Sequence, residues 1–443
     1  MTTITEVAQT MQVVLSETAR SAGRASGFVQ RASKLDGAGM TQTLVFGFLA
    51  NPQATWEELS QTAATLGLDI SAQGLDERLT ARAAECLRQV LQVAVAQVVR
   101  SETGVTLPIW ERFAGVYVQD SSTVSLPAAL AKVWQGCGGG QQAGDGAAAM
   151  KVQVQWELLS GQLSAVALQD GRAADRRAGY LLAGLPAGAV CLTDLGYFSL
   201  ERLDQQATQG VYWLTRLQAG KCVELDGHRG RLSDWLPARP GPTGEWAVRL
   251  GRQLGLACRL LARRVSPSLA ASRRRKLHTE ARRHGQAVSA ERLALADWEV
   301  LVTNVPADRL TLDEAWELAR VRWQIELLFK LWKSHGQIDA WRSAKPWRIL
   351  CEIYAKLIGQ IVQHWLLLLS CWARPDRSLR KAAQTIRKQA FHLASRLHTL
   401  ADLIKALEAL HTALQRGGRL NKRKAHPSTY QILAALPAKP TLA

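Results

Sequence analysis

Apolar and polar residues follow two different periods along the chain, and the period changes near Pro108. Before that residue, segments such as "TWEELSQTAATLGLDISAQGLDERL" place apolar residues at helical spacing, and no stretch alternates like a strand. Thr55 and Glu58 have the spacing of a capping box, and Gly67 breaks the pattern before a second helix. We expect a helical region over 1–107 containing a helix-turn-helix-like pair. Such a pair can bind DNA or only pack, and both interpretations stay open.

From 108 to 217 the pattern predicts strands with helices between them. "VYVQDSSTVSLP" alternates like a strand, and "MKVQVQWELLSGQLSAVALQD" is typical of two strands around a Ser-Gly turn. "RRAGYLLAGLP" favours a helix, "AGAVCLTD" a short buried strand, "FSLERLDQQATQG" a helix from Ser199 to Gly210, and "VYWLTRL" another strand. The fold class indicated is α/β, with three strands first and alternation afterwards.

Three further regions complete the predicted organisation. Residues 218–297 are irregular and rich in Gly, Pro and Arg, which indicates a strand-rich basic insertion. Over 298–350 the α/β domain resumes with the strand "WEVLVTNVP" and a helix beginning near Thr311. Residues 351–443 are expected to be helical, with a role in dimerisation or DNA contact. The glycine-rich "GCGGGQQAGDGAAAM" lacks the Lys-Ser/Thr ending of a phosphate-binding loop and favours a flexible hairpin tip.

Membrane and disulfide classes are not indicated. The start of the chain lacks a signal-peptide pattern, and Lys356, Gln360, Gln363 and His364 interrupt the most apolar window, so that window predicts a buried helix. The seven cysteines contain no C-x-x-C pair, so neither zinc nor a disulfide framework is expected. We expect a soluble, cytoplasmic protein that does not bind a membrane.

The net charge of +18, with Arg outnumbering Lys, indicates a polyanionic partner, and nucleic acid is the leading candidate. A genome bias toward Arg and Ala is the alternative explanation of the whole charge, but it would not place the charges in runs. One run is expected to follow a DNA backbone, although it can also be a solvated face; it contains Arg273, Arg274, Arg275, Lys276, Arg282 and Arg283.

The segment "ARVRWQIELLFKLWKSHGQID" carries one acid among several bases. On a helical wheel Arg322, Glu326 and Lys333 fall on one narrow stripe with Lys330 beside it, and apolar residues such as Trp323 and Leu327 cover the rest, which predicts a packed helix. An Arg322–Glu326 ion pair would explain the acid structurally. Alternatively, Glu326 binds a divalent metal while Arg322 and Lys333 hold a phosphate.

Two more acids make the metal hypothesis stronger. Asp120 follows the strand "GVYVQ", and Asp194 follows the strand "AVCLT". Either residue alone can be a turn or cap residue. Together with Glu326 they supply carboxylates from three separate elements, which two-metal phosphoryl transfer requires.

The order strand-Asp, strand-Asp, helix-Glu resembles the ribonuclease H-like fold of DDE transposases. "DSST", "LTDLGYFSLERL", "VLVTN" and "RWQIELLFKLWKS" resemble bacterial insertion-sequence transposases of family four. Arg322, Glu326 and Lys333 match that family's Y-x(2)-R-x(3)-E-x(6)-K pattern, whereas Ala319 stands where the family has Tyr. A Tyr there could bond a DNA phosphate, so Ala319 puts the strength of end binding in doubt.

The resemblance implies cut-and-paste DNA transposition at terminal inverted repeats by a ribonuclease H-like domain with helical flanks. Asp120, Asp194 and Glu326 would bind two Mg²⁺ ions, or Mn²⁺ in their place, one activating the attacking oxygen and one stabilising the leaving oxygen. The residues expected to contact DNA are Arg322, Lys333, Lys330, Arg216, Trp298 and the basic run. Trp298 is the candidate to stack on a flipped base, although a Trp at a strand start can equally be core.

Other consequences of the resemblance are double-stranded DNA as partner, a homodimer that pairs two transposon ends, and association with a bacterial nucleoid. Two rival functions share the same acids. One is a ribonuclease H-like nuclease that cuts without strand transfer, and the other is a DNA-binding relative that has lost catalysis, for which Ala319 is the sequence hint.

Overall fold

The chain folds into two compact units in a computed structural model. The first unit comprises residues 1–106, 121–173 and 324–426, and the second comprises 107–120, 174–323 and 427–443. The structure describes residues 3–31, 34–101, 104–138, 146–177, 184–237, 239, 241–283, 285–372, 374, 376–420 and 429–436.

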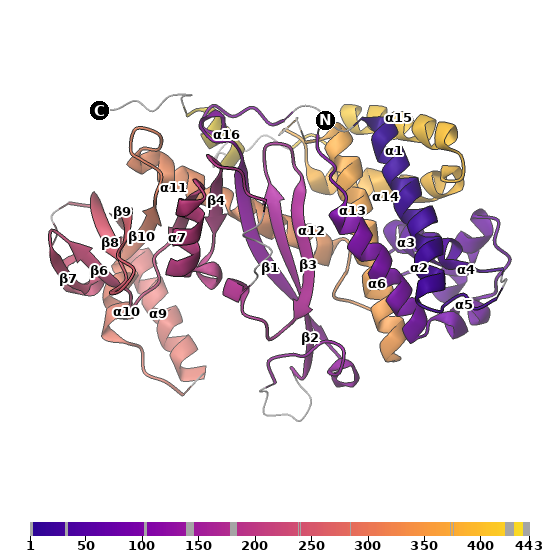
Figure 1. Cartoon of the computed structure of the whole chain (residues 1–443), viewed down its shortest axis with the longest axis horizontal. Coiled ribbons are helices and arrows are strands. Elements are labelled where there is room, and N and C mark those ends of the chain that lie inside the picture. The colour runs from indigo at the N-terminus through magenta and orange to yellow at the C-terminus, as the bar shows by residue number, and fades with distance from the viewer. Residues whose placement is uncertain are drawn as a thin grey trace. The chain divides into compact units, whose positions relative to one another are not determined.

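The first unit is mainly helical. Its helices are α1 (Ile4–Gln12), a π-helical continuation (Val13–Thr18), α2 (Ala19–Ala25), α3 (Gly37–Ala50), α4 (Trp56–Thr65), α5 (Ala72–Arg78), α6 (Ala81–Ala96), α12 (Trp323–Ser334, which begins at the unit boundary), α13 (Pro346–Ser370), α14 (Leu379–Arg396) and α15 (Leu400–Arg416). Helices α3 and α13 are buried along almost their whole length and pack on each other (Figure 1). They form the centre of this unit's core.

Helix α13 is the apolar window that predicted a buried helix, and that prediction is confirmed. Its polar residues are satisfied inside the protein: Lys356 Nζ donates to Glu352 Oε1 at 2.7 Å and to the carbonyl of Ala340 at 2.8 Å. In the described part of the chain, no helix combines the length and apolar character that crossing a lipid bilayer needs.

The Ser-Gly turn predicted between two strands is present in the first unit. Strands β2 (Ala148–Glu157) and β3 (Leu163–Asp170) pair antiparallel around it, and Gly161 adopts a positive φ of 76°. Upstream, the amide of Gly138 donates to the carbonyl of Gly146 at 3.0 Å, which closes the base of the glycine-rich segment; 139–145 lie outside the described residues.

The second unit contains a sheet in the order β1-β4-β5-β10-β9-β8-β6-β7. The strands are β1 (Val116–Leu126, which continues into the first unit), β4 (Val190–Thr193), β5 (Tyr212–Arg216), β6 (Cys222–Leu225), β7 (His228–Arg231), β8 (Thr243–Leu250), β9 (Leu256–Arg264) and β10 (Trp298–Thr303). Strands β1, β4 and β5 run parallel, whereas β10 and β9 pair antiparallel. The molecule is therefore a mixed α/β protein with a large sheet and helical flanks.

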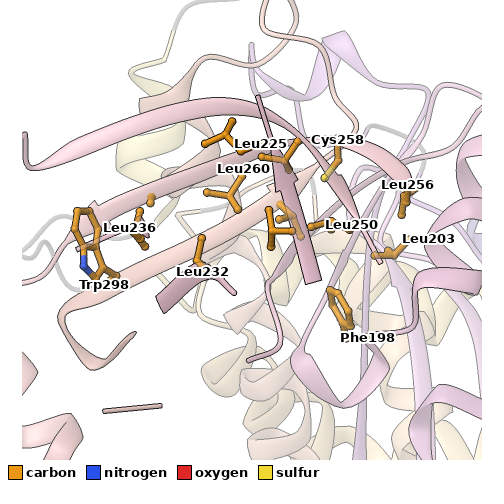
Figure 2. Close-up of a cluster of buried hydrophobic side chains, with 14 of the residues drawn as sticks. Phe198, Leu203, Leu225, Leu232, Leu236, Leu250, Leu256, Cys258, Leu260 and Trp298 are labelled. Atoms are coloured by element: carbon orange, nitrogen blue, oxygen red, sulfur yellow. The ribbon is translucent and has the colours of Figure 1, made fainter. Parts of the chain in front are cut away.

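The region predicted as a strand-rich insertion supplies the end of this sheet. The described residues of 218–297 form β6 to β9, the helices α8 (Leu232–Trp235), α9 (Pro267–Arg283) and α10 (Ala290–Ala294), and the 3-10 turn Leu295–Asp297. Figure 2 shows part of the apolar cluster below these strands, including Leu232, Leu250, Leu260 and Trp298. The insertion thus shares one hydrophobic core with β10.

Three more helices belong to the second unit: α7 (Leu200–Thr208), α11 (Leu312–Val321) and α16 (Thr429–Ala434). Ser199 caps α7 and Thr311 caps α11, as their sequences predict. The helix expected from "RRAGYLLAGLP" falls largely on 178–183, outside the described residues. Of the rest, Arg176 and Arg177 belong to the 3-10 turn Asp175–Arg177, and 184–186 are not helical.

Candidate active site

Two of the predicted acids and one predicted base lie in one row across the second unit's sheet. The parallel registers of β1 with β4, and of β4 with β5, align the residues that directly precede Asp120, Asp194 and Arg216. Residues in register on neighbouring strands point to the same face, and neighbouring strands lie about 4.8 Å apart. The sheet therefore gathers two carboxylates and one guanidinium. Asp194 follows the end of β4 and Arg216 ends β5, whereas Asp120 lies within β1, directly after the residues that pair with β4.

Each acid of this row has a defined environment. Asp120 is 20% exposed, and its Oδ2 lies 3.5 Å from Nη1 of Arg322. Asp194 caps the 3-10 turn Leu195–Tyr197, and its Oδ1 accepts a hydrogen bond from the amide of Gly196. The cap interpretation of Asp194 is thus correct, and the cap uses one of the two carboxylate oxygens.

A buried arginine that sequence reasoning missed lies behind the row. Arg202, on α7, is 5% exposed and donates to the side chain of Gln119, the residue before Asp120. Its guanidinium also lies 5.4 Å from the ring centre of Tyr197, in the turn that Asp194 caps. Arg202 therefore links the backbone segments that carry both acids. The sequence feature that could have predicted its burial is the position of Arg202 on the inner face of the short amphipathic helix "LERLDQQAT".

The helix expected to run without a break from near Thr311 is two helices. Helix α11 ends at Val321, Arg322 is its C-terminal cap, and α12 begins at Trp323. Arg322 itself keeps helical backbone angles, with φ −50° and ψ −32°, so the interruption is a single residue. Glu326 is half-buried in the first turn of α12.

The surface of α12 also differs from the prediction. Ile325, Leu328, Phe329, Leu331 and Trp332 are buried as expected, but Trp323 is 56% and Leu327 is 46% exposed. The helix thus presents an apolar strip to solvent, and the expectation that it is packed all round is wrong.

The two lysines of α12 have different surroundings. Lys330 is exposed. Lys333 is half-buried, and its Nζ donates to the carbonyl of Thr123 in β1 at 2.9 Å. Lys333 therefore ties α12 to the part of β1 that belongs to the first unit, in addition to any role toward DNA.

The second unit contains a cavity of about 740 Å³ beside the row. Its polar wall includes Asp194, Arg216, Lys276, Arg292, Arg320 and Arg322, and bases outnumber acids along it. Ala319, at the position of the family Tyr, lines the same cavity, and so does the exposed Trp323. A positively lined cavity next to two carboxylates suits a phosphate-bearing ligand.

The basic run lies on α9 and divides into two groups. Arg273 donates to the Trp298 carbonyl at 3.0 Å and to Glu299 Oε1 at 2.9 Å, and Arg274 pairs with Asp297 at 2.5 Å. Burial raises the pKa of the Glu299 carboxyl, but its bonds with Arg263 and Arg273 outweigh that effect and hold the pKa below its usual value. These two arginines anchor α9 to the sheet. The exposed members are Arg275, Lys276, Arg282 and Arg283.

Trp298 begins β10 and is only 6% exposed. Its ring belongs to the insertion's apolar cluster (Figure 2), and the Arg264 guanidinium lies 4.8 Å from the ring centre. It also lines the cavity. In this structure Trp298 packs in the core, and Trp323 is the aromatic residue of the cavity wall that is open to solvent.

The predicted N-terminal helix pair is present as α4 and α5. Thr55 and Glu58 form the reciprocal capping box at the start of α4. Helix α5 is short and contains Asp76 and Glu77, and Asp76 pairs with Arg348. The two acids of α5 do not favour close approach of this helix to DNA phosphates. The role of the helix pair in DNA binding remains a prediction.

Comparison with known proteins identifies the family. Residues 111–359 match the family described as Transposase DDE domain. The chain is 27% identical over 402 residues to the transposase for insertion sequence element IS231F of Bacillus thuringiensis subsp. israelensis, covering 85% of this chain and 83% of that protein. It is 26% identical to the IS231B transposase of B. thuringiensis subsp. berliner, covering 93% and 91%.

A third relative is the transposase for IS1151 of Clostridium perfringens, at 24% identity over 371 residues, which covers 78% of this chain and 76% of that protein. The family match covers more than half of the chain and contains the Asp120–Asp194 row and the Glu326 helix. The chain therefore belongs to the DDE transposase family of insertion sequences.

Proposed function

We propose that this transposase moves its element by cut-and-paste transposition, using metal-dependent phosphodiester hydrolysis and strand transfer at terminal inverted repeats. The observation that carries the proposal is the row of Asp120, Asp194 and Arg216, each directly after the paired residues of three neighbouring parallel strands. Two carboxylates attract divalent cations, and a guanidinium beside them attracts the phosphate on which those cations act.

The residues that would hold the metal are Asp120, Asp194 and Glu326. These three side chains offer only carboxylate oxygens as ligands. Mg²⁺ and Mn²⁺ prefer oxygen ligands, so the residues fit either ion. Among the described residues, neither unit by itself contains three or more His, Cys, Asp or Glu side chains that converge on one point. When bound, the two ions of such a site supply Lewis-acid activation of the attacking and leaving oxygens.

The protein's own groups bind and orient the DNA. Arg322 lies 3.5 Å from Asp120 and lines the cavity, so it can bridge this carboxylate and a phosphate of the transposon end. Arg216 stands at the opposite end of the row. Lys330, which is exposed on α12, can contact the same backbone from the helix that carries Glu326. Lys333 positions α12 through its bond to Thr123.

The strand pattern supports a ribonuclease H-like domain. An antiparallel hairpin, β2 and β3, lies in the sequence between β1 and the parallel strands β4 and β5, and a strand-rich insertion precedes the Glu326 helix. Right-handed crossovers between parallel strands place catalytic groups at their carboxyl ends. A homodimer that pairs two ends completes the proposal, because each element has two termini to cut and join.

The test is nicking and joining of DNA that carries the element's terminal repeat, with Mg²⁺ or Mn²⁺, by wild type and Glu326→Gln. The substitution keeps the size and removes the charge. We expect wild type to cut and join, and the variant to bind the repeat without cutting. Glu317→Gln is the matched control, because Glu317 is an acid of α11 paired with exposed Arg320.

Three other outcomes would contradict parts of the proposal. Cutting without joining would indicate a nuclease rather than a strand-transferring enzyme. Binding without cutting by wild type would indicate a relative that has lost catalysis. Normal cutting by Glu326→Gln would remove Glu326 from the metal site.

A further inference from the structure

Helix α14, in the first unit, contains five bases and no acid over Leu379–Arg396. Its inner face is made of small and aliphatic residues that pack against α3, α13 and α15. Those buried residues are Ala382, Ala383, Ile386, Ala390, Leu393 and Ala394. Four of the bases, Arg380, Lys381, Lys388 and Arg396, are exposed and therefore lie on the part of the helix that faces away from this core.

At about 100° per residue, Lys388 is turned about 80° from Arg380, and Arg396 about 80° further, so these bases spread over roughly 160° of the outward arc of α14. We define the α14 basic face by Arg380, Lys388 and Arg396, which are exposed and form no ion pair with an acid among the described residues. The neighbouring helix α15 differs, because Asp402 and Glu408 accompany its bases. The excess of positive charge is thus a property of α14 and not of this helical region in general.

The remaining two bases of α14 are engaged with the protein itself. Lys381 Nζ donates to the carbonyl of Arg419 at 2.8 Å. Arg387 is half-buried with Nη2 3.5 Å from the carbonyl of Ala50, and burial lowers the pKa of its guanidinium. These two residues hold the helix in place, which leaves the α14 basic face for an external partner.

The face adjoins the end of the helix that carries Glu326. His335 directly follows α12, and its pKa is lowered by burial and by the nearby charges of Arg380 and Arg387. Because salt screens charges beyond about 10 Å, this effect indicates that Arg380 lies near the end of α12. A duplex held on α14 would therefore run near the helix that carries a proposed metal ligand.

We propose that the α14 basic face binds the phosphate backbone of double-stranded target DNA, independently of its sequence. This inference rests on the proposed function. From Arg380 to Arg396 the helix spans about 24 Å at 1.5 Å per residue, a length comparable with seven base pairs of B-DNA. Long basic side chains spread along such a length can each reach a phosphate of a duplex that lies against the helix.

A protein partner fits this face less well. Phe391, 45% exposed, is the one large apolar side chain that α14 exposes among its described residues. Single exposed apolar residues are ordinary on protein surfaces, whereas protein interfaces have an apolar centre with few charges. Charge complementarity therefore favours DNA as the occupant.

The test compares Arg380→Gln/Lys388→Gln/Arg396→Gln with a control that removes three exposed bases elsewhere in the same unit, Arg24→Gln/Lys405→Gln/Arg416→Gln. Fluorescence anisotropy measures binding to a random-sequence duplex over a range of salt concentrations. A precleaved terminal repeat and a target plasmid measure joining, and an intact repeat measures nicking. Thermal unfolding confirms that both variants fold.

We expect the α14 variant to lose about tenfold or more in affinity for the random duplex, with the slope of log affinity against log salt reduced by about 2 to 3. Joining should fall in parallel, while nicking of the repeat stays within about twofold of wild type. The control should resemble wild type. If the α14 variant matches the control in affinity and slope, the inference is wrong.

Two further outcomes separate this inference from the proposed function. If the α14 variant loses binding and nicking only on the terminal repeat, the face holds the transposon end and the assignment to target DNA is wrong. If wild type does not nick at all, yet the α14 variant alone loses affinity for the random duplex, the proposed catalytic function fails and the α14 basic face stands as a DNA-binding surface.

Discussion

Nη1 of Arg322 lies 3.5 Å from Oδ2 of Asp120, at the junction between α11 and α12. Both side chains are about one-quarter exposed, so solvent reaches the pair and screens it. The arginine thus compensates a carboxylate proposed to bind a divalent cation, while it also lines the basic cavity. Its loss should have opposite effects on cation binding and on DNA binding.

Arg322→Ala should weaken binding of the transposon end by about 10- to 100-fold, the range for one charged hydrogen bond, and should slow strand cleavage with it. The same variant should bind Mn²⁺ more tightly, because Asp120 loses its positive neighbour. DNA anisotropy and Mn²⁺ titration by electron paramagnetic resonance measure the two effects. Arg229→Ala is the control, because Arg229 is an exposed arginine of the same unit that pairs with Glu224 and does not line the cavity. Unchanged cleavage would remove Arg322 from the site.

Ala319→Tyr should strengthen end binding by about 2- to 10-fold, the value of one neutral hydrogen bond. Ala319 lines the 740 Å³ cavity, which has room for a phenol ring, so the hydroxyl can reach a phosphate held there. Titration of terminal-repeat DNA measures the gain. Ala319→Phe adds the ring without the hydroxyl, and an equal gain in that variant would show that packing, rather than a hydrogen bond, improves affinity.

Trp298→Ala should lower the free energy of unfolding by about 3–5 kcal/mol, because it opens a cavity in the apolar cluster beneath the insertion. Trp298→Phe keeps most of the buried surface and should cost less. Urea unfolding followed by circular dichroism measures both. If Trp298→Ala is as stable as wild type but impairs DNA cleavage, the ring acts on DNA and its packing role is minor.

The buried His364 should make stability depend on pH. Its Nε2 donates to the Gly161 carbonyl at 2.7 Å, its ring packs against Trp156 and Trp372, and burial lowers its pKa to about 4. Between about pH 6.5 and pH 4 the unfolded chain binds a proton that the folded chain does not. The contribution of His364 to the free energy of unfolding is therefore complete above about pH 6.5. It is lost as the pH falls, at up to about 1.4 kcal/mol per pH unit.

His364→Gln keeps a hydrogen-bond donor and removes the titrating ring. Over pH 4 to 7 the free energy of unfolding of this variant should change less steeply than that of wild type. Urea titrations at half-unit pH intervals give the difference between the two slopes. Parallel curves would show that His364 does not cause the pH dependence.

The sequence alone determined most helices and strands, and it identified the acids proposed for catalysis. Period-2 and period-3.6 patterns depend on neighbours within a few residues, so they located β1, the β2–β3 hairpin, α7 and α13 correctly. The same local information placed Asp120 and Asp194 directly after buried strand residues. Three acids in that order carried the resemblance to the family that the comparisons then established.

The tertiary structure decided which distant segments meet. The registers of β1, β4 and β5 align Asp120, Asp194 and Arg216, and pairing between strands far apart in the chain cannot be read from periodicity. For the same reason the structure revealed Arg202 behind the two acids.

Tertiary packing also changed the roles of single residues. Trp298 became core, Trp323 stayed open to solvent, and Arg273 and Arg274 became anchors of α9, because each outcome depends on an atom contributed by another element. The chain broke its predicted helix at Arg322, next to Asp120, where no glycine or proline marks the break. Local propensity therefore determined which helices and strands the residues can form. Long-range packing determined which side chains they contact.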